Sequence, residues 1–194
     1  MGLFKRQSAD ERFWAWFQRN SARLLDFEAH RDAAFADLRS ALWRVDNGLV
    51  FEFGPAVRPR DFVISADGIV ERFPVVVRLV EAAPPMPDWH VVAFRQPGKP
   101  GLAVEFDGQS LGVDDLWFRT SQSGARTSLE THIRGLTDAN SRILMGAAFI
   151  LLDNALGEYA VATRIGQIDW LPLPDDPEAA GLIPLAALPG VVGT

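Results

Sequence analysis

Carboxylate and imidazole side chains on predicted strands are the groups of this chain that could do acid–base or metal chemistry. Glu52, Glu130, His132 and Glu158 lie on predicted strands or at their ends. Alternate side chains of a strand share one face, so these four groups could converge in one site. An antiparallel sheet also commonly turns one polar face to solvent, and alternating Glu, Thr and His is typical of that face. Both interpretations stay open, and we predict neither a metal nor a cofactor.

A serine between two glycines gives a second candidate. The segment 108–112 has Ser110 at its centre and matches the G-x-S-x-G pattern of a hydrolase nucleophile elbow, for which His132 could be the base. The elbow requires a sharp turn from a strand into a helix. Residues 113–120 alternate like another strand instead. We therefore interpret the segment as a connection between strands that is bounded by glycines.

Ser65, Asp67 and Arg95 are candidate ligand-binding residues. Ser65 and Asp67 lie between a predicted strand and a predicted helix, where backbone N–H groups can face an anion. Asp67 would repel a phosphate, and an Asp-Gly turn explains the same residues. Arg95 ends a predicted strand and could contact a carboxylate or a phosphate. The alternative for Arg95 is an internal ion pair.

Two tryptophans near the N-terminus, Trp14 and Trp16, are candidate interface residues. They belong to a predicted helix over residues 11–20, and exposed aromatic side chains often mark interfaces. Trp14 and Phe17 share one face of this helix, whereas Trp16 points elsewhere. Either the helix is clamped onto the core, or one aromatic contacts another subunit.

The elements that position these residues follow a pattern that occurs twice. A second helix is predicted from a cap at Ser21 to about residue 43. Two strands, a helix and a third strand follow, and the same order then recurs in the second half of the chain. The first set is predicted at residues 49–53, 60–66, 70–83 and 89–96, and the second at 113–120, 126–134, 138–156 and 158–165. We expect the strand at 89–96 to be central and the helix at 138–156 to be deeply buried.

Two β-β-α-β units with N-terminal helices predict an α+β fold. We expect a mainly antiparallel sheet, either one shared sheet or two joined sheets, with the helices packed on one face. Residues 1–9 are predicted to be a flexible tail. Residues 10–173 would form a single domain of two halves, about 10–107 and 108–173. Residues 174–194 would form a Pro/Ala-rich C-terminal tail packed on the surface.

Composition narrows the classes of function. The 194 residues carry a net charge of −6, which argues against a nucleic-acid or anionic-membrane partner, since these need clustered Lys and Arg. The chain has no cysteine, so disulfides, thiolate metal sites and cysteine nucleophiles are excluded. The N-terminus has no apolar signal core, and we expect a cytoplasmic protein.

Five strings of this sequence resemble those of a bacterial protein family with no assigned activity. They are Phe13–Asn20, Phe51–Pro55, Ile64–Gly68, Ala93–Gln96 and Leu151–Tyr159. The resemblance spans roughly residues 10–173. It implies a bacterial and cytoplasmic protein and assigns no catalytic residue.

We conclude from the sequence that the leading hypothesis is a non-enzymatic binding or regulatory module. Its predicted partner is a second copy of the chain or another protein. One alternative is a small hydrolase or metal-dependent enzyme that uses the strand-borne carboxylates and His132. Another is an immunity or inhibitor protein for a basic partner, which the acidic charge favours.

Overall fold

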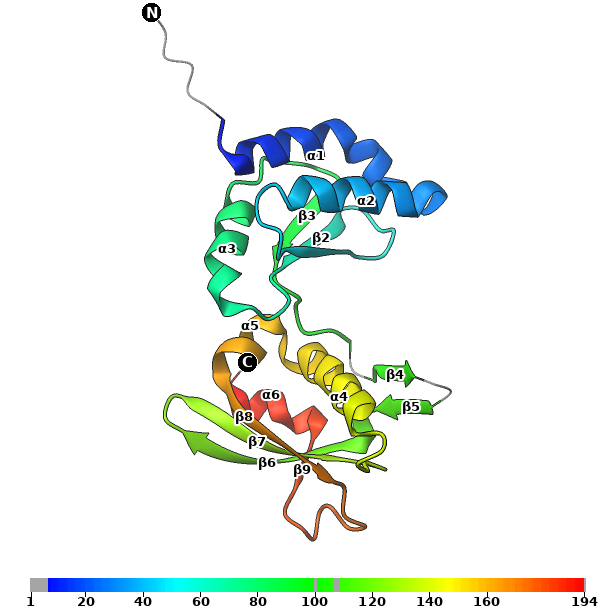
Figure 1. The fold of residues 1–194 in the computed structure, drawn as a ribbon, viewed down its shortest axis with the longest axis vertical. Helices are drawn as coiled ribbons and strands as arrows, with labels where there is room; N and C mark the ends of the chain where they lie inside the picture. Colours follow the sequence, from blue (N-terminus) through cyan, green and yellow to red (C-terminus); the bar gives the residue numbers. More distant parts are fainter. Residues whose placement is uncertain (1–6, 100, 107–108, 194) are drawn as a thin grey trace, which may run out of the picture. The chain divides into compact units, whose positions relative to one another are not determined.

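The computed structural model describes residues 7–99, 101–106 and 109–193, and contacts divide the chain into two compact units between Phe94 and Arg95 (Figure 1). The predicted junction of the two halves, residues 107–108, lies outside the described residues. Each unit combines helices with β-sheet, and most strand pairs are antiparallel. The predicted α+β class is confirmed.

Unit 1 holds the N-terminal helices and a three-stranded sheet. Its elements are α1 (Ala9–Leu25), the short 3-10 helix η1 (Phe27–His30), α2 (Arg31–Leu42), β1 (Val50–Phe53), β2 (Arg60–Ser65), η2 (Val70–Arg72), α3 (Phe73–Glu81) and β3 (Trp89–Ala93). The strand order is β1-β2-β3, with β1 antiparallel and β3 parallel to β2. The strand at Trp89 is therefore an edge strand, and the expectation of a central position was wrong.

The first helix begins and ends elsewhere than predicted. Ser8 and Glu11 form a capping box, with Ser8 Oγ accepting from Glu11 N at 3.0 Å and Glu11 Oε2 accepting from Ser8 N at 2.7 Å. The helix continues through Ser21, whose hydroxyl accepts a hydrogen bond from Trp89 Nε1 at 2.8 Å and does not cap a second helix. The break comes at Asp26.

Aromatic rings fill the core of unit 1 between its helices and one face of its sheet. Phe62 of β2 stacks on Phe17 of α1 at a centroid distance of 4.7 Å. Phe53 of β1, on the same face, contacts Phe27 and Phe35 of η1 and α2. Because α1, η1 and α2 all meet this one face, the predicted packing of helices on one face holds in this unit.

Unit 2 contains two sheets. Its elements are β4 (Ala103–Phe106), β5 (Gln109–Gly112), η3 (Val113–Asp115), β6 (Leu116–Ser123), β7 (Arg126–Ile133), α4 (Ser141–Leu156), α5 (Glu158–Arg164), β8 (Ile165–Pro172), β9 (Ile183–Pro184), η4 (Leu185–Ala187) and α6 (Leu188–Val192). β4 and β5 form an antiparallel pair, and the larger sheet has the order β8-β7-β6-β9. In the larger sheet, only β7 and β8 are parallel.

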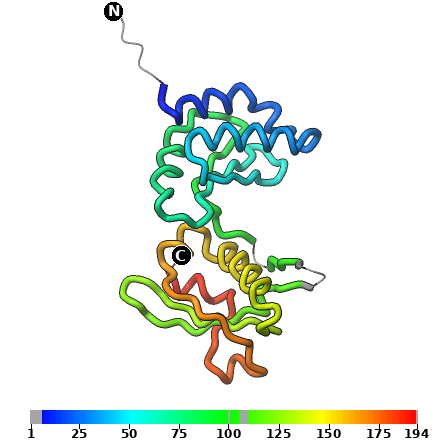
Figure 2. The backbone as a smooth tube through the Cα atoms, in the orientation of Figure 1, coloured from blue at the N-terminus to red at the C-terminus, as the bar shows by residue number. Residues whose placement is uncertain are grey.

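The core of unit 2 lies between its helices and one face of the larger sheet. Leu129 and Ile133 of β7 pack there with Leu151 of α4 and Val161 of α5. Residues 174–194, which the sequence predicts to be a tail on the surface, supply β9 and the buried Leu188. Figure 2 shows this C-terminal segment, in red, returning to lie beside α4, in yellow.

The predicted repeat is present as topology. In each unit an antiparallel strand pair is followed by a helix and then by a strand parallel to the second of the pair: β1-β2-α3-β3, and β6-β7-α4-α5-β8. The segment Glu158–Arg164 is the helix α5, so the predicted strand there was wrong. Gly157, at φ 80° and ψ 150°, turns the chain into this second helix. The return strand is β8.

Candidate functional site

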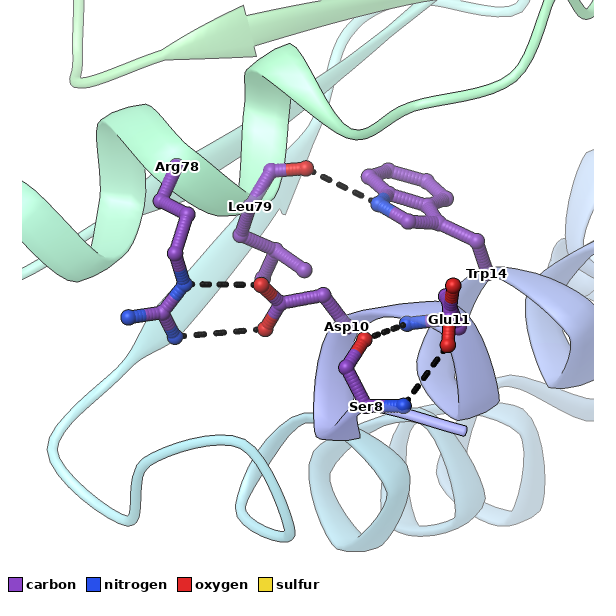
Figure 3. Close-up of polar contacts among 6 residues, drawn as sticks. All are labelled: Ser8, Asp10, Glu11, Trp14, Arg78 and Leu79. Carbon is purple, nitrogen blue, oxygen red and sulfur yellow. Dashed lines mark hydrogen bonds and ion pairs between the residues drawn. The ribbon is translucent and has the colours of Figure 1, made fainter. Parts of the chain in front are cut away.

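Trp14, a candidate interface residue, lies in the core of unit 1. Its indole Nε1 donates to the carbonyl of Leu79 at 2.8 Å, which satisfies one of the last carbonyls of α3 (Figure 3). Beside it, Arg78 Nε and Nη2 donate to the two oxygens of Asp10 at 2.7 and 3.2 Å. These contacts fasten α1 to α3. Trp16 is half-buried, and its ring lies tilted against that of Phe13 at a centroid distance of 6.5 Å.

The candidate anion site at Ser65 and Asp67 is a turn in which these two residues hydrogen-bond to each other. Ser65 is fully buried, and its hydroxyl accepts a hydrogen bond from the backbone N–H of Asp67 at 2.9 Å. Asp67 and Gly68 both have positive φ, at 54° and 75°, as an Asp-Gly turn requires. The Ser65 hydroxyl is thus engaged within the backbone of its own turn.

Arg95 and Glu158 meet at the start of unit 2. The backbone N–H of Arg95 donates to Glu158 Oε2 at 3.1 Å, and the backbone N–H of Glu158 donates to the Arg95 carbonyl at 2.9 Å. The guanidinium Nη1 lies 4.0 Å from Asp153 Oδ2. Glu158 is buried, so this carboxylate holds the chain entering unit 2 against the N-terminus of α5.

Glu130 and His132 lie together on the outer face of the larger sheet. Glu130 Oε2 accepts from Arg119 Nη1 at 2.7 Å and lies 3.8 Å from His132 Nε2. His132 Nδ1 lies 3.1 Å from the carbonyl of Pro172, and a carbonyl only accepts, so Nδ1 carries the proton. Arg119 also donates to the carbonyl of Ala180 at 2.9 Å. The group ties strands and the C-terminal segment together.

The four strand-borne candidates do not share one face. Glu130 and His132 alternate with Leu129 and Ile133, which face the helices, so they point to the opposite side of the sheet. Glu158 begins a helix on the core side, and Glu52 belongs to unit 1. Within residues 7–99, 101–106 and 109–193, no three His, Asp or Glu side chains form a group that could hold a metal ion.

Ser110 lies in the middle of a strand. It belongs to β5, where its residue partner on β4 is Glu105, and the next element after β5 is the short 3-10 helix η3. A nucleophile elbow needs a serine at the turn between strand and helix. Gly108, the first glycine of the pattern, lies outside the described residues.

Unit 1 has a shallow hollow of about 230 Å³ beside Trp89. Gln18 and Ser21 of α1 line it on one side, and Met86 and Asp88 of the proline-rich loop line it on the other. Pockets that bind small molecules usually have volumes of about 300–1,000 Å³. The hollow is therefore smaller than a usual ligand site.

Helix α4 carries a surface that the sequence did not reveal. Its core side repeats at three- and four-residue spacing and consists of the buried residues Leu144, Ala147, Ala148, Leu151, Leu152 and Leu156. The opposite side is exposed at Arg142, Ile143, Gly146, Phe149 and Ile150, which we name the α4 outer face. The expectation that α4 is deeply buried is correct for one side of the helix only.

Three large apolar side chains dominate the α4 outer face. Ile143, Phe149 and Ile150 are 48, 43 and 53% exposed. Ile143 and Ile150 are seven residues apart, about two helical turns, and Phe149 precedes Ile150, so all three lie on one side of the helix with Gly146 between them. Contiguous exposed apolar patches on a folded protein mark surfaces that bind a partner. The sequence signal was the width of the apolar arc of α4, which is wider than one core-facing stripe needs.

Comparison with known proteins gives no relative: no family model, no curated protein and no solved structure matches this chain. None of the described helices is by itself long and apolar enough to cross a membrane. Helices α4 and α5 reach that composition together, with a bend of 104° between them.

Proposed function

We propose that this protein is a non-enzymatic module that binds another protein chain through the α4 outer face. The observation that carries the proposal is the exposure of Ile143, Phe149 and Ile150 on one side of a single helix. The arrangement of the side chains considered for catalysis supports it. Glu130, His132 and Glu158 are engaged in contacts within unit 2, and Glu158 lies on the core side of the sheet whereas Glu130 and His132 lie on the other side.

The physical driving force is the removal of apolar surface from water. Burial of such surface contributes about 25 cal/mol per Å². The helix is already held in place by its buried side against the sheet of unit 2, so a partner does not have to order it. A rigid apolar patch of this kind is suited to receive a helix or an apolar strand of a partner.

Cysteine labelling tests the proposal cleanly, because the chain has no cysteine of its own. In the variant Ile143→Cys, the only thiol lies on the α4 outer face. Ala33→Cys, on the exposed side of α2, is the matched control. Both variants are labelled with a maleimide as dilute purified protein and again in an extract of the source cells.

We expect the cysteine at position 143 to be labelled quickly in dilute solution and at least about tenfold more slowly in the extract. The cysteine at position 33 should react at the same rate in both. Equal rates at position 143 in dilute solution, in the extract and in the concentrated purified protein would contradict the proposal, because no protein chain would then cover the face. Slow labelling in dilute solution would contradict it too, because the face would be covered within its own chain.

A further inference from the structure

We infer that the chain that covers the α4 outer face is a second copy of this protein, in an antiparallel crossing of two α4 helices at Gly146. The inference rests on the proposed function and names its partner. The exposed positions of α4 are symmetric about Gly146: Ile143 and Phe149 lie three residues to either side, and Arg142 and Ile150 lie four. A twofold interface needs a self-complementary surface of this kind.

The twofold operation brings complementary residues together. With Gly146 facing Gly146 of the second copy, the side of each helix that carries Ile143 and Ile150 meets the same side of the other helix, so Ile143 faces Ile150 and Arg142 faces Phe149. Every large apolar side chain of the face therefore meets either an apolar side chain or the aliphatic part of Arg142. The patch is covered completely by its own copy.

Gly146 permits two helices to approach closely. A Cβ built on this residue meets nothing within 4 Å, so the space above it is open. The absence of a side chain at the centre of the face leaves a notch between Ile143 and Ile150. Ridges formed by residues four apart on one helix pack into the grooves of another, and a glycine at the crossing shortens the distance between the two axes.

Charge favours the antiparallel arrangement over a parallel one. Arg142 is the only charged residue of the α4 outer face, and it lies at the N-terminal end of the helix. Asp153 lies about one turn beyond Ile150, its side chain is 25% exposed, and its Oδ2 is 4.0 Å from Arg95 Nη1. Antiparallel packing places Arg142 of one copy within reach of Asp153 of the other, whereas parallel packing would place like charges together.

The size of the face sets the expected strength of association. Stable complexes bury about 1,600 Å² in total, with 20–30 residues on each side. The α4 outer face has five residues, so we expect a reversible dimer that dissociates on dilution.

Analytical ultracentrifugation across a range of concentrations tests the dimer with the full chain. We expect the wild-type protein to associate reversibly. Ile150→Glu, at a position already 53% exposed, should raise the dissociation constant at least about tenfold. Val57→Glu is the matched control, because Val57 is an exposed apolar residue of unit 1 and should leave association unchanged.

The variant Gly146→Leu distinguishes a specific helix crossing from non-specific association of apolar surfaces. The new side chain enters open space, so the variant should fold as the wild type does. The leucine also enlarges the exposed apolar area, so association that is only non-specific and hydrophobic would become stronger. A close crossing at Gly146 predicts the opposite, a loss of the dimer. Association of Gly146→Leu that equals or exceeds that of the wild type would overturn the inference.

The labelling variants distinguish failure of the inference from failure of the proposed function. If the cysteine at position 143 is protected when the purified chain is concentrated, a second copy covers the face. If the purified chain stays monomeric and protection occurs only in the extract, the inference is wrong and the binding module stands. Protection of the monomer by phosphatidylglycerol vesicles would assign the face to a lipid surface and overturn both.

Discussion

Arg78 of α3 and Asp10 of α1 form a bidentate ion pair, with Nε–Oδ2 and Nη2–Oδ1 distances of 2.7 and 3.2 Å. The Asp10 side chain is 11% exposed, whereas that of Arg78 is 57% exposed. The carboxylate raises the pKa of the Arg78 guanidinium above its ordinary value through these hydrogen bonds. The pair joins the first helix of the chain to a helix more than sixty residues later.

Replacement of Asp10 tests how much this pair holds α1 in place. We expect Asp10→Asn to lower the free energy of unfolding of unit 1 by about 1–2 kcal/mol, since hydrogen bonds to charged groups are strong but Arg78 is partly screened by water. Asp37→Asn is the control: the Arg23–Asp37 pair has the same 2.7 Å distance and is exposed on both sides. Urea unfolding followed by tryptophan fluorescence measures both. Equal losses would show that burial of Asp10 contributes nothing.

The stability of unit 1 should depend on pH through Glu28. Arg60 Nη2 donates to Glu28 Oε1 at 2.7 Å, and this hydrogen bond lowers the pKa of Glu28 below its ordinary value in the folded protein. A lowered folded pKa means that the stabilisation is present above the unfolded pKa and is lost as pH falls through the folded pKa. We therefore expect the wild type to lose more stability than Glu28→Gln between pH 6 and pH 3. Parallel pH profiles for the two proteins, from urea melts, would contradict this role of Glu28.

A buried hydroxyl in unit 2 should be dispensable. Thr131 of β7 is fully buried, and its Oγ1 has no hydrogen-bond partner among the described residues. An unpaired buried hydroxyl costs free energy, and valine has nearly the same shape without it. We expect Thr131→Val to raise the free energy of unfolding of unit 2 by up to about 1 kcal/mol. The thermal midpoint of unit 2 should rise accordingly.

Thr127 offers the matched control for that substitution. It lies on the same strand and face, and its Oγ1 accepts from Gln122 Nε2 at 3.4 Å. Thr127→Val should therefore leave the thermal midpoint unchanged or lower it. If Thr131→Val destabilised unit 2 more than Thr127→Val, the hydroxyl of Thr131 would have to be satisfied in solution.

Two glycines of one region should respond in opposite directions to alanine. Gly157 has φ 80° and ψ 150°, and a Cβ there would lie 2.9 Å from Pro97 Cδ and 3.2 Å from the carbonyl oxygen of Arg95. We expect Gly157→Ala to destabilise unit 2 by more than about 2 kcal/mol, because that backbone region is almost restricted to glycine. Gly146→Ala, in open space within a helix, should stabilise it by roughly 0.5–1 kcal/mol. Circular dichroism melts at low protein concentration check both, and a stable Gly157→Ala would contradict the structure at the α4–α5 turn.

Much of the topology could be predicted from local pattern. Alternation along β6 and β7 and the spacing of apolar residues in α3 and α4 gave the two β-β-α-β units in the right order. The segment Glu158–Arg164 was misassigned because Tyr159, Val161 and Thr163 alternate like residues of a strand. The helix there depends on the turn at Gly157 and on hydrogen bonds between Glu158 and Arg95, which are distant in sequence.

The candidate site was less accessible to sequence reasoning. Side-chain type identified Glu130 and His132 as neighbours, and the structure brings them within 3.8 Å of each other. Sequence reasoning could not show that Glu158 lies on the other side of the sheet. The face on which a single carboxylate lies depends on the helix or strand that carries it. Trp14 was likewise ambiguous, since an aromatic helix face can pack on a core or on a partner.

The sequence by itself determined the α+β class, the repeated order of elements and the exclusion of cysteine chemistry, because periodicity and composition are local properties. Only the tertiary structure decided which part of the wide apolar arc of α4 is buried. The sheet of unit 2 covers one side of that helix and leaves Ile143, Phe149 and Ile150 in contact with water. The burial of a residue depends on which other elements pack against it, and the local sequence around the residue does not specify those elements.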